Sequence, residues 1–290
     1  MKRLYSMLPM PVRMRLFRSA GLALMLACAA SPVLASQASD WSVTNGAAIR
    51  LLPGDARPGG DGLAGLEIRL DEGWKTYWRS PGDAGIPPTF DWSKSENLGS
   101  ITVLWPAPQR IDDEAGSSAV YKNDTILPLK LTAADPSKPI ELRLALDYAI
   151  CHDICVPAKG EASLTLVPSP RDEGEGADDI AAAARRVPVP VAFGTQASLA
   201  IEQVHVDTSA KPAVLTIDTK SPVPATLFIE GPANWFLPMP APAPDADKAN
   251  PQRFTLRLEG LPKNATLSGT SLRLTLSTGD TGIESLYRLP

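Results

Sequence analysis

Cysteine and histidine are scarce in this chain of 290 residues, which contains three cysteines and two histidines. The sequence shows no Cys₄ or Cys₂His₂ spacing of a structural zinc site, no glycine-rich phosphate loop and no serine–histidine–carboxylate set. These absences disfavour zinc enzymes, nucleotide-binding enzymes and serine hydrolases, and no cofactor is implied. The few cysteines are therefore the first candidates for chemistry.

Long hydrophobic runs are also lacking, and no segment after residue 35 approaches the roughly 20 apolar residues of a membrane helix. A short apolar run at residues 20–30 follows five basic residues and precedes Ala35, which has the small-residue spacing of a cleavage site. We therefore predict a signal peptide over residues 1–35 and a soluble, periplasmic chain after cleavage, a compartment in which disulfides persist. An uncleaved membrane anchor and a lipoprotein signal ending at Cys28 are the alternatives.

Positive charge becomes scarcer once the predicted signal peptide is removed. Its loss leaves 23 basic against 32 acidic residues, which changes the net charge from −4 to −9. That balance argues against nucleic acid or an anionic membrane as a partner. Proline, at 29 of 290 residues, is used roughly twice as often as average and disfavours long helices. The length that remains is consistent with two domains built from short strands.

Two cysteines, Cys151 and Cys155, lie between two predicted strands. Apolar and polar residues alternate over residues 140–150 and again over 161–166, which is typical of strands with one buried and one wet face. The pair is therefore expected in the connection of a hairpin, with Pro157 and Gly160 helping the turn. Continuing the alternation places Cys151 on the polar side, away from the core.

Further strand patterns precede this hairpin and predict one all-β unit over residues 40–167, a β-sandwich. Between them, residues 73–88 form a block rich in aromatic and turn residues. We interpret Trp74, Tyr77 and Trp78 in this block as core packing beside a turn, with a docking surface as the alternative.

Residues 168–190 have the polar, glycine-rich composition of a linker, with one short helix expected over residues 178–186. Six strand patterns follow and predict a second β-sandwich over residues 191–290, at residues 199–206, 214–219, 225–230, 254–258, 272–276 and 283–289. The proline-rich stretch at residues 238–251 is interpreted as a surface excursion.

The cysteine pair is open to three interpretations. A structural disulfide closing five residues would contribute roughly 2 kcal/mol, against about 4.7 for a 100-residue loop, so a staple alone is a poor explanation. A copper(I) site would use Cys151, His152 and Cys155, although the set is one ligand short for structural zinc. Thiol–disulfide exchange is the third, in which protonated His152 would lower a neighbouring thiol pKa and Asp153 would raise it.

At these residues the chain resembles a known family. Residues 148–157, with Cys151-His152-Asp153-Ile154-Cys155, resemble the cysteine hairpin in the N-terminal periplasmic domain of the thiol:disulfide interchange protein DsbD. The sequence is more similar still to the ScsB-like (suppressor of copper sensitivity) group. This likeness is carried by the block at residues 73–92, by Trp105-Pro106-Ala107-Pro108 and by residues 121–128. The resemblance covers roughly residues 45–167, and residues 191–290 match the extra domain of that group in style.

The resemblance implies an immunoglobulin-like sandwich that shuttles electrons without a cofactor. Its cysteine pair would take reducing equivalents from a membrane thiol-electron transporter and pass them to thioredoxin-like or isomerase-like periplasmic proteins. By position, Cys155 would form the mixed disulfide and Cys151 would resolve it.

Three departures from the family pattern stand out. The two cysteines are closer together than in DsbD, and we expect the chain to act without membrane and thioredoxin-like domains of its own. The loop that shields the pair with aromatics in DsbD has Asp112-Asp113 here, with Glu114-Ala115 at the aromatic positions. The shield is therefore expected to be weak or built differently, and Asp112 and Asp113 are candidates for tuning the thiols, although solvated loop carboxylates are the simpler interpretation.

Together, these features predict a periplasmic thiol–disulfide oxidoreductase of the protein-disulfide reductase type, with Cys151 and Cys155 as the reacting pair. The alternative is a non-catalytic binding or copper(I)-handling module with a structural disulfide.

Overall fold

The computed structural model describes residues 37–56, 61–114, 116–167, 174–244, 246–247, 249–250 and 252–290. The predicted signal peptide and residues 168–173 of the predicted linker lie outside these ranges. The described residues belong to a single compact unit that begins at Ala35. Among them, no helix is both long enough and apolar enough to cross a membrane.

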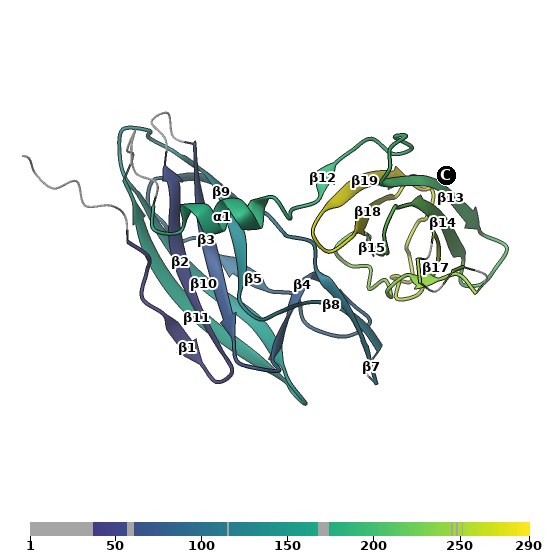
Figure 1. Cartoon of the computed structure of the whole chain (residues 1–290), viewed down its shortest axis with the longest axis horizontal. Helices are drawn as coiled ribbons and strands as arrows, with labels where there is room; N and C mark the ends of the chain where they lie inside the picture. Colours follow the sequence, from purple (N-terminus) through teal and green to yellow (C-terminus); the bar gives the residue numbers. More distant parts are fainter. Residues whose placement is uncertain are drawn as a thin grey trace, which may run out of the picture. The chain divides into compact units, whose positions relative to one another are not determined.

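The first sandwich consists of two antiparallel sheets (Figure 1). One sheet has the strand order β1 (Ser42–Thr44), β2 (Ala47–Ala56), β3 (Asp61–Leu70), β9 (Thr125–Ala133) and β6 (Leu98–Val103). The other has the order β11 (Cys155–Leu166), β10 (Ile140–Cys151), β4 (Lys75–Gly82), β8 (Gly116–Lys122) and β7 (Gln109–Asp113), with β5 (Thr89–Asp91) paired to β10.

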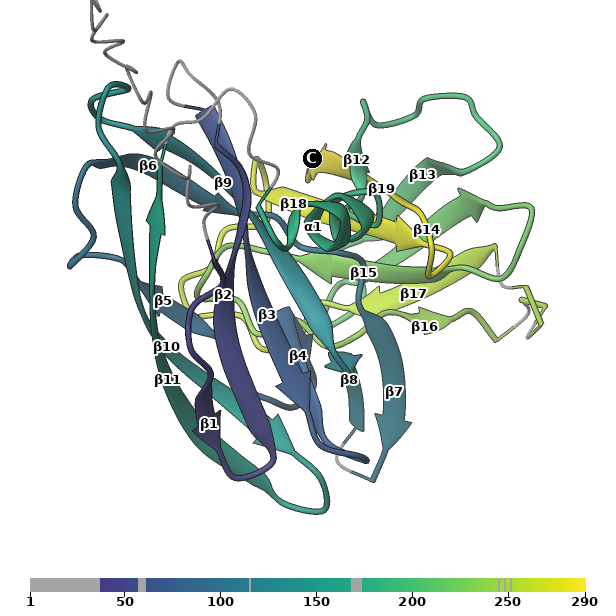
Figure 2. The same ribbon diagram turned by 60° about the vertical axis from the view of Figure 1, so that its left-hand side comes forward.

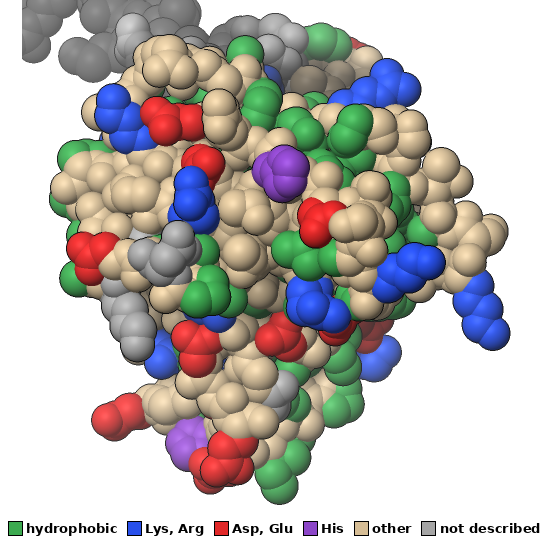
Figure 3. Space-filling view, turned by 90° about the vertical axis from the view of Figure 1, so that its right-hand side faces the viewer, with side chains coloured by type: hydrophobic (Ala, Val, Ile, Leu, Met, Phe, Trp, Pro, Cys, Tyr) green, Lys and Arg blue, Asp and Glu red, His purple; other side chains and the backbone are tan. Residues whose placement is uncertain are grey.

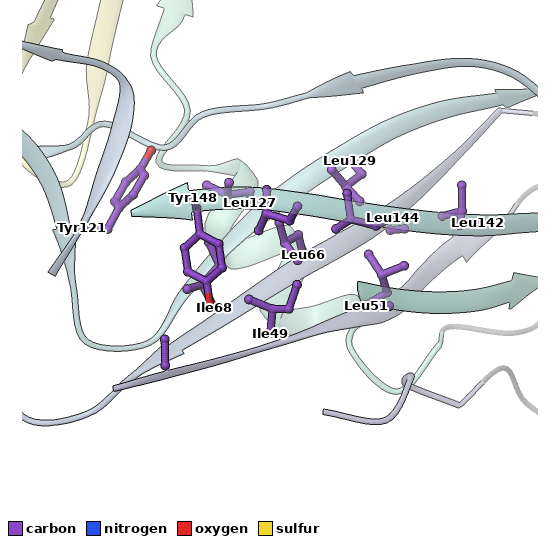
Figure 4. Packing of buried hydrophobic residues seen from close by; sticks show 14 of the residues in the cluster. Ile49, Leu51, Leu66, Ile68, Tyr121, Leu127, Leu129, Leu142, Leu144 and Tyr148 are labelled. Atoms are coloured by element: carbon purple, nitrogen blue, oxygen red, sulfur yellow. The ribbon is translucent and has the colours of Figure 1, made fainter. Parts of the chain in front are cut away.

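The core of this sandwich is built from the apolar positions that alternate along its strands. Along β10, Leu142, Leu144 and Tyr148 point inward, while Arg143 and Asp147 face solvent. Figure 4 shows the side chains of Leu142, Leu144 and Tyr148 beside side chains from the opposite sheet, which are those of Ile49, Leu51, Leu66, Ile68, Leu127 and Leu129. The segments with period-two alternation are thus strands, as predicted, and each sheet buries one face.

The predicted short helix is present as α1 (Ala177–Ala184), with Asp178 and Asp179 in its first turn. Its buried residue, Ile180, packs on the first sandwich, because a Cβ added to Gly65 of β3 would lie 2.8 Å from Ile180. This part of the predicted linker is therefore packed against a sheet instead of spanning free between two domains.

A second sandwich follows (Figure 2), and six of its strands match the six predicted patterns, whereas two short strands at residues 189–190 and 241–242 were not predicted. One sheet has the order β12 (Val189–Pro190), β19 (Gly282–Arg288), β18 (Ser271–Ser277) and β15 (Thr226–Glu230). The other has β13 (Ala200–Asp207), β14 (Val214–Lys220), β17 (Arg253–Arg257) and β16 (Ala241–Pro242). Buried leucines and isoleucines of β14, β15, β17 and β18 form its core, so the all-β prediction is confirmed for both halves.

The surface carries both charge signs. Acidic and basic side chains are interspersed with hydrophobic groups on the face shown in Figure 3. Among the described residues, several acidic and basic side chains form exposed pairs within one sheet, such as Arg253–Asp218 between β17 and β14. Such pairs contribute little to stability in water.

The turn prediction is wrong. Pro157 and Gly160 lie inside β11, where they pair with Ala149 and Leu146, so the turn is made by residues 152–154 alone. The proline-rich stretch begins with two contacts to the first sandwich: the amide of Met239 donates to Asp83, and the carbonyl of Pro240 accepts from Arg110.

Candidate redox site

The two cysteines close the hairpin between β10 and β11. Cys151 is the last residue of β10 and Cys155 the first of β11, they are register partners, and their sulfurs form a disulfide. Because directly paired residues on neighbouring strands point to the same face, both sulfurs lie on the outer face of the sheet, opposite the main core. The predicted hairpin is therefore confirmed, with the pair at its tip.

The two cysteines differ in exposure. Cys155 is exposed, whereas Cys151 is only 5% exposed and packs with Tyr77, Val120 and Ala149. The expectation that Cys151 faces solvent is therefore wrong. Strand alternation did place it on the correct face, away from the main core, but side chains of β4 and β8 cover that face. A thiol approaching from solvent reaches Cys155 first.

Tyr77 makes the direct contact with the exposed sulfur. Its hydroxyl lies 3.1 Å from Cys155 Sγ. A disulfide sulfur carries no hydrogen, so the tyrosine hydroxyl is the donor. Burial raises the pKa of Tyr77 above its ordinary value; nearby Lys75 opposes this shift and Asp113 adds to it. The hydroxyl therefore stays protonated at neutral pH and remains able to donate.

The position of Tyr77 follows from the alternation of β4. Lys75 and Tyr77 share the outer face, whereas Trp78 points into the main core. The ring is covered from outside by Gly85, whose φ is +116° and whose added Cβ would lie 2.3 Å from Tyr77 Cε1. A side chain at this position would displace the ring, so glycine is required for the close approach.

His152 and Asp153 occupy the turn between the cysteines. His152 Nδ1 lies 3.0 Å from Asp153 Oδ2, and its ring centroid is 5.8 Å from that of Trp74. An added Cβ on Gly73 would lie 2.6 Å from His152 Nε2. These contacts direct the imidazole toward the turn that precedes β4, so its influence on the thiols remains a prediction.

The two candidate aspartates of the β7–β8 hairpin bind different partners. Asp113 pairs with Lys75 at 2.8 Å, and Lys75 is the register partner of Cys151, so this charge pair lies beside the disulfide. Asp112 instead binds Arg110 and Ser117; although burial raises its pKa, hydrogen bonds from Ser117 and Arg110 bring it below its ordinary value. Asp113 is thus the better placed of the two to act on the site.

The aromatic group at the disulfide comes from β4 and not from the loop where the family pattern places it. Glu114 is exposed and Ala115 lies outside the described residues. Sequence reasoning noted Tyr77 but missed its contact with Cys155. The available signal was its parity with Lys75, which places it on the opposite face from the buried Trp78.

The comparison with known proteins gives two kinds of match. The family model described as "Thiol:disulfide interchange protein DsbD, N-terminal" matches residues 48–166. The crystal structure of the N-terminal periplasmic domain of ScsB from Proteus mirabilis is similar in fold, with a TM-score of 0.65 and 19% identity over 88% of this chain and 98% of that chain.

A second solved structure is the N-terminal domain of Neisseria meningitidis DsbD in the reduced form. It aligns with 42% of this chain and 90% of that chain, at 18% identity and a TM-score of 0.27, which is too low to support an argument. Among curated proteins, none matches the chain.

Proposed function

We propose that residues 48–166, which match the family model of the DsbD N-terminal domain and carry the Cys151–Cys155 disulfide, are a thiol–disulfide exchange module, and that the chain relays electrons to disulfides of periplasmic proteins. The electrons would come from a membrane-side dithiol donor and pass to thioredoxin-like or isomerase-like acceptors. The observation that carries this proposal is the unequal exposure of the two cysteines. An exposed cysteine backed by a buried partner suits a pair that is attacked from one side and resolved from the other.

In the donating half-reaction, the Cys155 thiolate attacks one sulfur of the acceptor disulfide. A bond forms between Cys155 and that sulfur, and the second acceptor sulfur leaves as a thiolate that takes up a proton. Cys151, deprotonated in turn, attacks Cys155 and releases the first acceptor thiolate. The acceptor gains two electrons and becomes a dithiol, while Cys151 and Cys155 are oxidised to the disulfide.

The donor restores the dithiol by the same steps in reverse. Its thiolate attacks the exposed Cys155, the Cys151 thiolate leaves, and the second donor thiol resolves the mixed disulfide. Attack at Cys155 is favoured because Cys151 is shielded by Tyr77 and Val120.

Tyr77 has a defined part in both directions. Its hydroxyl donates to Cys155 Sγ in the disulfide, and the same donor stabilises a Cys155 thiolate in the dithiol form. A stabilised thiolate is more abundant at neutral pH and attacks a disulfide sooner, although its intrinsic nucleophilicity falls slightly.

Trapping of mixed disulfides tests the proposal. The Cys151→Ser variant retains the exposed thiol of the pair and is expected to accumulate a mixed disulfide with an oxidised thioredoxin-like protein, whereas Cys155→Ser retains the buried thiol of the pair and is the matched control. The reduction potential of the wild-type pair is measured alongside. A potential far below about −300 mV, typical of inert structural disulfides, combined with no trapped species would rule out the redox function.

A further inference from the structure

Strand β4 contacts both the disulfide and the second sandwich through three consecutive residues. Tyr77 lies against Cys155, as described above. The Trp78 ring packs on Phe228 of β15, with centroids 5.4 Å apart. The guanidinium of Arg79 binds Glu230 of β15 and Glu284 of β19. Strand β4, which carries the Tyr77 donor, is therefore held in place by residues of the second sandwich.

The Arg79 contact is a half-buried network of four charges. Arg79 donates to both oxygens of Glu230, at 2.9 and 2.7 Å, and to Glu284 at 2.6 Å. Arg273 of β18 completes the set, at 3.0 Å from Glu284. The side chains of Arg79, Glu230 and Glu284 are only 19%, 16% and 16% exposed. Two positive and two negative charges balance, and the bidentate geometry fixes the direction of the Arg79 side chain.

A second attachment holds the loop that covers Tyr77. Asp83, two residues before Gly85, accepts from the amide of Met239 at 2.8 Å and from the amide of Ser117 at 2.9 Å. Met239 also packs on Gly82, where an added Cβ would lie 2.5 Å from its Cγ. The second sandwich thus holds the start of the loop whose backbone rests on the tyrosine ring.

We propose that the second sandwich is a positioning element for the redox pair. Through Arg79 and Asp83 it holds β4 and the covering loop so that the Tyr77 hydroxyl stays on Cys155 Sγ. The proposal rests on the thiol–disulfide function proposed above and assigns to the second sandwich a role in the reactivity of Cys155. Arg79 and Asp83 are positioning residues, since both act through Tyr77 and neither touches a sulfur.

The pH profile of Cys155 alkylation tests this proposal. The full chain carrying Cys151→Ser leaves one redox thiol, and mass spectrometry of the Cys155 peptide follows its reaction with iodoacetamide. Loss of one hydrogen bond to the charged thiolate is worth about one to two pH units in the midpoint. We expect an upward shift of that size for Tyr77→Phe, and a shift in the same direction, no larger, for Arg79→Ala.

The chain offers a closely matched control in Arg50 of β2. Arg50 binds Glu67 at 2.6 Å, its side chain is 24% exposed, and it stacks on Trp41 at 4.5 Å. Arg79 stacks on Trp78 at the same 4.5 Å. Arg50→Ala therefore removes a similar ion pair and stacking contact from the opposite sheet. It is expected to leave the Cys155 midpoint unchanged.

A double variant decides whether the effect passes through Tyr77. In the Tyr77→Phe background, Arg79→Ala should add no further shift, because the contact it positions is already gone. Equal shifts in Arg79→Ala and Arg50→Ala, or a full Arg79→Ala shift in the Tyr77→Phe background, would overturn the proposal.

A second variant guards against failure of Arg79→Ala to fold. Asp83→Ala removes the hydrogen bonds that the Asp83 carboxylate accepts from the amides of Met239 and Ser117, and it should raise the midpoint in the same direction. An unchanged midpoint in folded Asp83→Ala counts against the proposal. Alkylation needs no protein partner, so these outcomes are independent of the trapping result that tests the redox function itself.

Discussion

Phe228 comes from the second sandwich by sequence, yet its ring packs in the core cluster of the first. It is only 1% exposed, lies 5.4 Å from the ring of Trp78, and belongs to the same cluster as Leu66 and Leu142. Phe228→Ala should therefore destabilise the first sandwich as well as the second, although the substitution lies outside residues 48–166.

The expected size of this effect follows from the burial. A buried phenylalanine removes roughly 150–250 Å² from water, which at about 25 cal/mol per Å² corresponds to about 4–6 kcal/mol. Measured Phe→Ala substitutions in cores cost about 3–5 kcal/mol, and we adopt that range. At about 2–4 °C per kcal/mol for a chain of this size, the melting temperature should fall by roughly 6–20 °C.

Urea unfolding followed by circular dichroism measures the change in free energy. Phe236→Ala is the matched control, because Phe236 lies on the same sandwich but is 79% exposed, so its loss should stay within about 0.5 kcal/mol. Protection of the β10 amides from hydrogen exchange reports on the first sandwich directly. A loss below about 1 kcal/mol, or unchanged β10 protection, would refute the shared core.

Burial raises the pKa of Tyr148 to about 12, so stability from this group is complete below its ordinary value near 10 and declines as pH rises from there toward 12. Near-ultraviolet difference spectroscopy should show the late ionisation, and Tyr148→Phe should lose that alkaline decline; an ordinary midpoint would contradict the burial. Hydrogen bonds from the Ser137 side chain and backbone lower the pKa of Asp135 to about 2, so the stability it contributes is present above its ordinary value near 3.8 and disappears as pH falls toward 2. A carboxyl titration by NMR checks this value, and Asp135→Asn should remove that part of the acid dependence. Copper(I) titration of the reduced chain tests the metal-handling alternative: because Asp153 and Trp74 direct the His152 imidazole toward Gly73, His152→Ala should leave any copper(I) affinity unchanged, and a tenfold loss would show that this histidine is a ligand.

The strands that flank the cysteines illustrate what local pattern predicts well. Residues 140–150 and 161–166 alternate with period two, and both segments are strands that pair in the predicted hairpin. The prediction that Pro157 and Gly160 help the turn was wrong, although proline and glycine are common in turns. Pro157 is tolerated because β11 is an edge strand of its sheet, where a missing amide costs no ladder hydrogen bond. Gly160 is needed for packing, since an added Cβ would lie 2.4 Å from Ile49 Cδ1.

The error at Cys151 has a different cause. Alternation along β10 determines which face of the sheet a residue occupies, but not what covers that face. Along most of β10 the outer face is wet, as at Arg143 and Asp147, whereas at Cys151 it is covered by Tyr77 and Val120. Those side chains come from strands that lie 74 and 31 residues earlier in the chain, and no periodicity within β10 reports on them.

The all-β class, the strand segments of both sandwiches and the hairpin that carries Cys151 and Cys155 can be predicted from the amino-acid sequence, because each follows from spacing among near neighbours. The disulfide, the burial of Cys151, the contact between Tyr77 and Cys155 and the attachment of β4 to the second sandwich are visible only in the folded chain. The hydrogen bonds from Arg79 to Glu230 and Glu284 span 151 and 205 residues of chain. Contacts at such separations depend on how completed sheets pack against one another, and that packing is not encoded in the local alternation of apolar and polar residues.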